Sequence, residues 1–82
     1  LVNALHSEDR PKSVEDLSER EKEVVSAVAG GLTNAEIATA FQISTATVKS
    51  HVSNAMNKLA VRDRTQLAVS ALLYGLIDPQ MV

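Results

Sequence analysis

The chain has 82 residues and a formal net charge of −2, a length that accommodates one domain with a small core. The absence of cysteine excludes disulfide bonds and thiolate metal sites, and one Phe, one Tyr and no Trp are too few aromatic rings for stacking on single-stranded nucleic acid. No long apolar run occurs, so we expect a cytoplasmic protein without a membrane partner.

The charged residues are distributed unevenly along the chain. Residues 33–82 carry four basic and three acidic side chains, and all four basic ones lie between Lys49 and Arg64. Such a segment is compatible with nucleic-acid binding and equally with an ordinary solvated surface. Charge alone therefore does not decide the function.

Residues 1–16 are expected to form a linker, since charges, serines and Pro11 occur there without a sustained apolar period. We place the folded domain at residues 17–77 and a C-terminal tail at residues 78–82. Because the chain starts with Leu1 rather than Met, we expect it to be a fragment of a longer protein.

The first predicted helix begins after Ser18. This serine can accept a hydrogen bond from the amide of Glu21, whose carboxylate can return the bond in a capping box. Four apolar residues then share one face at helical spacing: Val24, Val25, Val28 and Leu32. Gly30 and Gly31 are expected to end the helix, because glycine adopts the left-handed conformation of a C-cap.

The second predicted helix begins after Thr33, which forms the same type of box with Glu36. Its apolar face consists of Ile37, Ala38 and Phe41. A helix of about two turns is too short to be stable in isolation, so tertiary packing has to hold it.

The third predicted helix covers residues 45–59, and Ser44 is its expected N-cap after a tight connection. Its core face consists of Val48, Val52, Ala55 and Leu59. The opposite face is small and polar, with Ala46, Ser50, Ser53 and Asn57 at its centre and Lys49 and Asn54 at its edges. No bulky side chain on that face prevents close approach.

The fourth predicted helix begins after Asp63 and ends before Gly75. Its expected core face consists of Leu67, Ala68, Ala71 and Leu72. The far face carries four residues that we interpret as a homodimer surface: Gln66, Val69, Ser70 and Leu73. A helix that is apolar on two sides usually has two partners, although isolated apolar residues on a surface are the simpler alternative.

Two helices joined by a short turn, the second with a polar outer face, form the pattern of a helix-turn-helix, whose second helix fits the major groove of double-stranded DNA. The amino end of the 45–59 helix offers Ser44, Thr45 and Thr47 to a phosphate. The candidate groove contacts are Lys49, Ser50, Ser53, Asn54 and Asn57, and the candidate phosphate contacts beyond them are Lys58, Arg62 and Arg64. The pattern alone also fits a helical protein-interaction module.

Several linked motifs resemble the LuxR/NarL/GerE-type helix-turn-helix over about residues 16–77: LSERE at 17–21, GLTNAEIA at 31–38, IS at 43–44, TVKSHVSN at 47–54, KL at 58–59, and Arg64. The resemblance implies an all-α, four-helix domain whose third helix enters the major groove and whose fourth helix dimerises. It implies the output domain of a bacterial transcriptional regulator, most often a two-component response regulator. An autoinducer-type or stand-alone LuxR/GerE regulator is the alternative.

The resemblance also assigns site residues by position. Lys49, Ser50 and Ser53 match positions that face bases. The positions that match phosphate contacts are Thr33, Asn34, Ser44, Thr45 and Thr47. RNA polymerase is a further candidate partner of such a regulator.

The chain departs from the family pattern at two places. Ala60 stands where the family has glycine, and alanine is strained at positive φ. The 45–59 helix also carries few basic residues, so we expect modest affinity from one copy and a larger role for dimerisation.

Other chemistries are poorly supported by the sequence. His51 lies beside the core face without a second ligand at metal spacing, and the serines lack a base–acid constellation. We therefore expect no metal, no cofactor and no catalysis. Glu19, Glu21 and Glu23 are expected on a solvated face directed away from DNA, since their charges would repel phosphate.

Overall fold

The structure, a computed structural model, describes residues 14–76. Within that range a short 3-10 turn, η1 (Val14–Asp16), precedes four α-helices, and no strand occurs: α2 (Glu19–Ala29), α3 (Asn34–Phe41), α4 (Thr45–Leu59) and α5 (Arg64–Leu73). The predicted all-α, four-helix class is confirmed. Most of the predicted linker at residues 1–16 and the whole tail at residues 78–82 lie outside the described residues, while residues 14–16 form η1.

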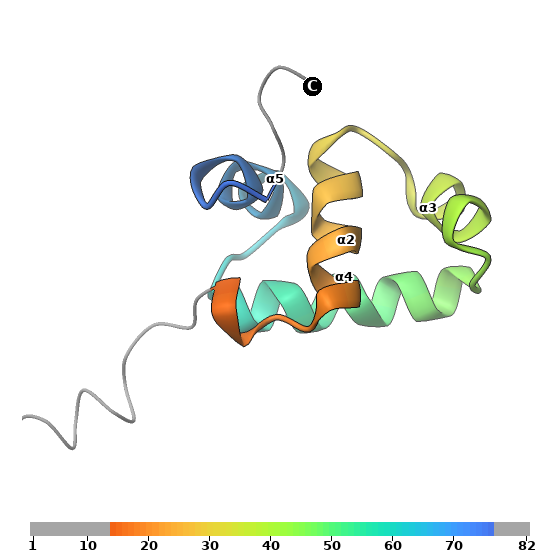
Figure 1. Cartoon of the computed structure of the whole chain (residues 1–82), viewed down its shortest axis with the longest axis horizontal. Helices are drawn as coiled ribbons and strands as arrows, with labels where there is room; N and C mark the ends of the chain where they lie inside the picture. Colours follow the sequence, from red (N-terminus) through yellow and green to blue (C-terminus); the bar gives the residue numbers. More distant parts are fainter. Residues whose placement is uncertain (1–13, 77–82) are drawn as a thin grey trace, which may run out of the picture.

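The four helices surround one core (Figure 1). Helix α2 stands steeply on α4, with α3 beside one end of α4 and α5 beside the other. Helix α2 packs against both α4 and α5, and α3 packs mainly against α4. The connection between α3 and α4 consists of Gln42, Ile43 and Ser44, the short turn that a helix-turn-helix needs.

Every α-helix starts with the predicted polar N-cap. Ser18, Thr33 and Ser44 each accept a hydrogen bond from the third amide of their helix, at 3.1, 3.1 and 3.0 Å between nitrogen and oxygen. Asp63 does the same for the amide of Gln66 at 2.8 Å. These bonds satisfy amides that have no carbonyl partner within the helix, and each contributes about 1 kcal/mol to helix stability.

The helices also end in one shared way. A residue with positive φ follows each helix or its last turn: Gly31 (94°), Gln42 (59°), Ala60 (57°) and Gly75 (73°). The next residue donates its amide to a carbonyl five positions back, as Leu32 does to Ala27 and Leu76 does to Ala71. These apolar residues, Leu32, Ile43, Val61 and Leu76, pack against the core, so each helix end is tied to the domain interior.

Each α-helix contributes at least one fully buried side chain, the largest being Ile37, Leu67, Val24, Val25 and Val48. The predicted core faces are confirmed for α2, α3 and α4, with Phe41 and Leu32 only partly buried. The prediction was wrong for Leu72, which is 38% exposed. The core face of α5 is centred on Leu67 and Ala71, one turn apart, and Leu72 lies about 100° around the helix from Ala71.

The prediction that Glu21 lies on a solvated face was also wrong. Its side chain is buried, and its Oε1 accepts hydrogen bonds from the Ser18 amide and the Lys58 ammonium, both at 2.9 Å. Burial raises the pKa of Glu21, but the Lys58 ammonium and the Ser18 amide outweigh it, so the pKa lies below its ordinary value. This pair joins α2 to the last turn of α4.

Candidate nucleic-acid interface

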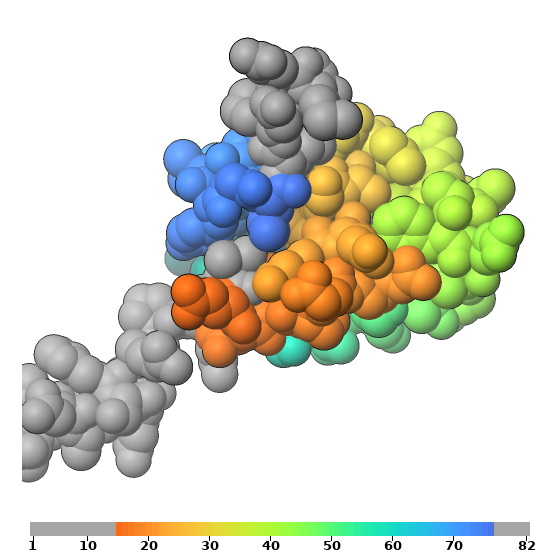
Figure 2. Space-filling model, viewed as in Figure 1, coloured from red at the N-terminus to blue at the C-terminus, as the bar shows by residue number. Residues whose placement is uncertain are grey.

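The outer face of α4 is polar, exposed and free of large side chains. Val52 and Leu59 turn inward, whereas Ser50, Ser53 and Asn57 are exposed on the opposite side. In Figure 2, α4 runs along the lower edge of the molecule, below the residues of η1 and α2. Its buried face packs against the core that it shares with α2, so the outer face lies away from α2. A backbone can therefore approach another surface closely along this side of α4.

The amino end of α4 presents hydroxyl groups and helix amides together. Ser44, Thr45 and Thr47 are all exposed. The Oγ atoms of Ser44 and Thr47 lie 2.9 Å apart and share a hydrogen bond, while Ser44 Oγ also accepts from the Thr47 amide. The first-turn amides of a helix have no carbonyl to bond within the helix, and together with the helix dipole they favour an anion.

Within residues 14–76, four of the basic side chains are held by other parts of the protein. Arg20 pairs with Glu23, Lys22 with Glu19, and Lys58 with the buried Glu21. Arg64 bonds the loop before α3. The pair of Arg20 with Glu23 was one of the alternatives that the sequence offered for this arginine, beside Glu36 or a phosphate. The bonds of Lys58 and Arg64 were not predictable, because they join residues 30 or more positions apart in the chain.

Lys49 and Arg62 are different. Both are exposed, and neither side chain makes an ion pair or hydrogen bond among the described residues. Lys49 is on α4, and Arg62 is in the connection that follows α4. The unneutralised positive charge of the described region is thus concentrated on and beside α4. The predicted contact Lys58, by contrast, has its ammonium bound to Glu21 at 2.9 Å.

The start of α3 brings two predicted contacts together. Thr33 is exposed and caps the helix, and Asn34 is half-buried. Arg64 donates from Nη1 to Asn34 Oδ1 at 2.7 Å and from Nη2 to the Leu32 carbonyl at 2.8 Å. The guanidinium therefore joins the amino ends of α5 and α3.

The far face of α5 exposes the apolar side chains that were interpreted as a dimer surface. Val69 is 48% exposed and Leu73 is 77% exposed. Gln66 is exposed, but its Oε1 already accepts a hydrogen bond from the Arg62 amide at 2.7 Å. Sequence reasoning missed two exposed neighbours, Leu72 and Tyr74, which enlarge this apolar surface.

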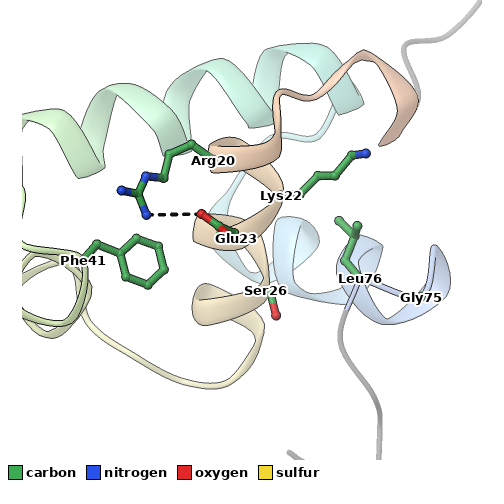
Figure 3. Close-up of a pocket in the computed structure, with 7 residues that line it drawn as sticks. All are labelled: Arg20, Lys22, Glu23, Ser26, Phe41, Gly75 and Leu76. Carbon is green, nitrogen blue, oxygen red and sulfur yellow. Dashed lines mark hydrogen bonds and ion pairs between the residues drawn. The ribbon is translucent and has the colours of Figure 1, made fainter.

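A hollow of about 540 Å³ lies between α2, the end of α3 and the end of α5 (Figure 3). Its lining consists of Arg20, Lys22, Glu23, Ser26, Phe41, Gly75 and Leu76. The Arg20 guanidinium lies over the Phe41 ring, 5.0 Å from its centroid, and bonds Glu23 at 3.2 Å. The charged side chains that line the hollow are thus paired within the protein, and no residue of α4 lines the hollow.

Residues 14–76 contain no group of three or more His, Cys, Asp or Glu side chains arranged to hold a metal ion. None of the helices in the same range combines the length and the apolar character that crossing a bilayer requires.

Known proteins are similar to this chain in sequence. Residues 15–71 match the family described as bacterial regulatory proteins, luxR family. The transcriptional regulatory protein LnrK of Bacillus subtilis is 46% identical over 74 residues, which are 90% of this chain and 34% of LnrK. The response regulator protein VraR is 47% identical over 69 residues in Staphylococcus aureus and in Staphylococcus epidermidis, covering 84% of this chain and 33% of each relative.

The chain thus spans about a third of the length of these curated relatives. The matched segment contains α2, α3 and α4 and most of η1 and α5, so the family covers the helix-turn-helix and the helices that support it. The family consists of transcription regulators and not of enzymes, and DNA binding is its implied activity. This chain belongs to the luxR family of bacterial regulatory proteins.

Proposed function

We propose that this chain is the sequence-specific, double-stranded DNA-binding output domain of a two-component response regulator. Helix α4 enters the major groove and α5 forms a homodimer contact. The domain extends over residues 17–77, with the linker and tail outside it, and acts in the cytoplasm. The names of the relatives, a transcriptional regulatory protein and response regulators, support this proposal over an autoinducer-type or stand-alone regulator.

One observation carries the proposal. Two basic side chains make no ion pair or hydrogen bond within residues 14–76: Lys49 on α4, and Arg62 in the connection that follows α4. Small exposed serines on the outer face of α4 allow the helix backbone to approach base edges, and Lys49 can reach a base or a phosphate.

The remaining proposed contacts lie around the major groove and are mostly to phosphates. We propose that Thr33, Asn34, Ser44, Thr45 and Thr47 bond phosphates around the amino ends of α3 and α4. Arg62 bonds phosphate beyond the end of α4, and Asn54 and Asn57 offer amides to the groove. Lys58, whose ammonium also binds Glu21, is a further proposed phosphate contact in the last turn of α4. RNA polymerase is the protein partner that we propose for the DNA-bound regulator.

Selection of duplexes from a randomised pool by this chain tests the proposal. We expect enrichment of a short motif that occurs in two half-sites, and affinity for it that falls linearly with salt concentration on a log–log scale. Equal recovery of all duplexes would contradict sequence-specific binding. Absence of any salt-sensitive duplex binding would favour the protein-interaction module instead.

A further inference from the structure

Arg64 is the first residue of α5, yet its guanidinium is bound at the start of α3. It donates to Asn34 Oδ1 at 2.7 Å and to the Leu32 carbonyl at 2.8 Å, and the side chains are partly buried. Two bonds from one planar group to two neighbouring residues fix the position of that loop. The sequence suggested instead that Arg64 contacts phosphate directly.

The bond to Arg64 also fixes which way the Asn34 amide faces. Arginine carries only donors, so the oxygen of the amide has to face the guanidinium and the nitrogen has to lie on the other side. Within residues 14–76, no buried side-chain nitrogen or oxygen lacks a hydrogen-bond partner. Because Asn34 Nδ2 makes no bond in that range, it is not fully buried, and neither of its hydrogens is bonded there.

We infer that Arg64 is a positioning residue: it holds the Asn34 amide so that Nδ2 donates to a DNA phosphate at the start of α3. This inference rests on the proposed function, in which Asn34 is a phosphate contact. Without Arg64, the amide rotates freely and can present its oxygen, which a phosphate repels. Arg64 then strengthens DNA binding although its charge does not touch DNA.

Non-specific DNA is sufficient as a probe, because phosphate contacts are independent of base sequence. We would measure the affinity of the full 82-residue chain for a labelled duplex of mixed sequence across a range of salt concentrations. The variants are Arg64→Gln, Asn34→Ala and the double variant, with Thr39→Ala on the same helix as a control. Circular dichroism at the assay temperature establishes that each variant is fully folded, and Arg64→Lys replaces Arg64→Gln if the latter is not.

We expect Asn34→Ala to weaken binding about tenfold, since one hydrogen bond to a charged group is lost. Arg64→Gln weakens binding by about threefold to tenfold in the parent and leaves affinity unchanged in the Asn34→Ala background. The salt slope stays the same in both single variants, because no charge that contacts DNA is removed.

Two results would overturn the inference. If Arg64→Gln lowers the magnitude of the salt slope by about 1 and is additive with Asn34→Ala, Arg64 contacts a phosphate itself. If Arg64→Gln lowers only the melting temperature and leaves affinity intact, its role is confined to the fold. Failure of the proposed function is distinguishable from both, because the parent chain would then not bind the duplex in a salt-dependent way.

Discussion

At the scale of single residues, Ala60 carries a backbone conformation that suits glycine better. Its φ is 57°, and its amide and that of Val61 close the end of α4. A left-handed conformation costs an L-residue about 1–2 kcal/mol. Glycine avoids this strain, but it loses more conformational entropy on folding, so replacing alanine by glycine here would recover only part of that free energy. Alanine in place of the family's glycine at position 60 therefore keeps the turn, and we expect it to lower the free energy of unfolding relative to glycine.

We expect Ala60→Gly to raise the free energy of unfolding by about 0.5–1 kcal/mol, because the strain disappears and the exposed methyl group has few contacts to lose. Urea denaturation measures this. The matched control is Ala40→Gly, which replaces an exposed alanine inside α3. This variant should lower the free energy of unfolding by a similar amount, because glycine destabilises a helix interior. Equal losses in both variants would show that Ala60 is not strained.

A second residue-scale prediction concerns acid. The folded-state pKa of Glu21 lies below its ordinary value of 4.5, so the carboxylate stabilises the fold above that value, and this contribution is lost as the pH falls through the folded-state pKa. Glu21→Gln keeps the shape and removes the charge. We expect it to cost about 1–3 kcal/mol near neutral pH.

The difference in unfolding free energy between the parent and Glu21→Gln should shrink as the pH falls below 4.5. Urea titrations at a series of acidic pH values measure it, and the comparison cancels other carboxylates that titrate in both proteins. A difference that stays constant with pH would contradict the role given to this ion pair.

The helix caps were predictable because each depends on residues three positions apart. Ser18 and Glu21 were correctly assigned to a capping box from spacing alone. The bond from Lys58 to the same carboxylate was not predictable, since it joins residues 37 positions apart and exists only after α2 docks on α4. For the same reason, the sequence suggested Lys58 and Arg64 as phosphate contacts, whereas the structure engages both within the protein.

At the scale of elements, α4 shows what amphipathic spacing does predict. Its inner and outer faces follow from a period of 3.6 residues, and the bounds 45–59 agree with the structure. The core face of α5 is harder to predict, because the helix is apolar on two sides and spacing alone does not fix the limits of that face. Leu72 was misassigned for that reason.

The two faces of the domain offer a matched test of the α4 interface. Lys49→Ala should weaken binding to the selected site by about 1–3 kcal/mol, because the proposed function gives Lys49 a contact to a base or a phosphate. Lys22→Ala removes the same charge from α2, where the lysine pairs with Glu19, and should leave affinity unchanged. Fluorescence anisotropy with the selected duplex measures both, and far-ultraviolet circular dichroism should be the same for each. Equal losses would mean that net charge, rather than the α4 face, drives binding.

At the scale of the whole molecule, net charge is a poor guide to this domain. The chain is acidic overall, yet six of the charged side chains in the described part neutralise one another in three ion pairs. What DNA would meet is the local field at α4 and the connection after it. With only two free cations there, one copy has few phosphate contacts, and a second copy on the same DNA becomes important.

The surface that would join two copies is the far face of α5. Val69 and Leu73 lie one turn apart and are 48% and 77% exposed, with the exposed Leu72 and Tyr74 beside them. A contact between two such short faces buries too little area for a stable dimer in solution. We therefore expect a monomer at micromolar concentration that binds paired half-sites, about one DNA turn apart, cooperatively.

Leu73→Glu places two carboxylates against each other in that contact, so we expect it to abolish cooperative binding to paired half-sites. Affinity for a single half-site should be unchanged, which also controls for repulsion between the new charge and DNA. Leu73→Ser removes the apolar side chain without adding charge and should lower cooperativity to a smaller extent. Binding isotherms on duplexes with one and two half-sites measure these effects. If Leu73→Glu binds paired sites as cooperatively as the parent, the two copies meet through another surface, and the exposed leucines of α5 have a different partner.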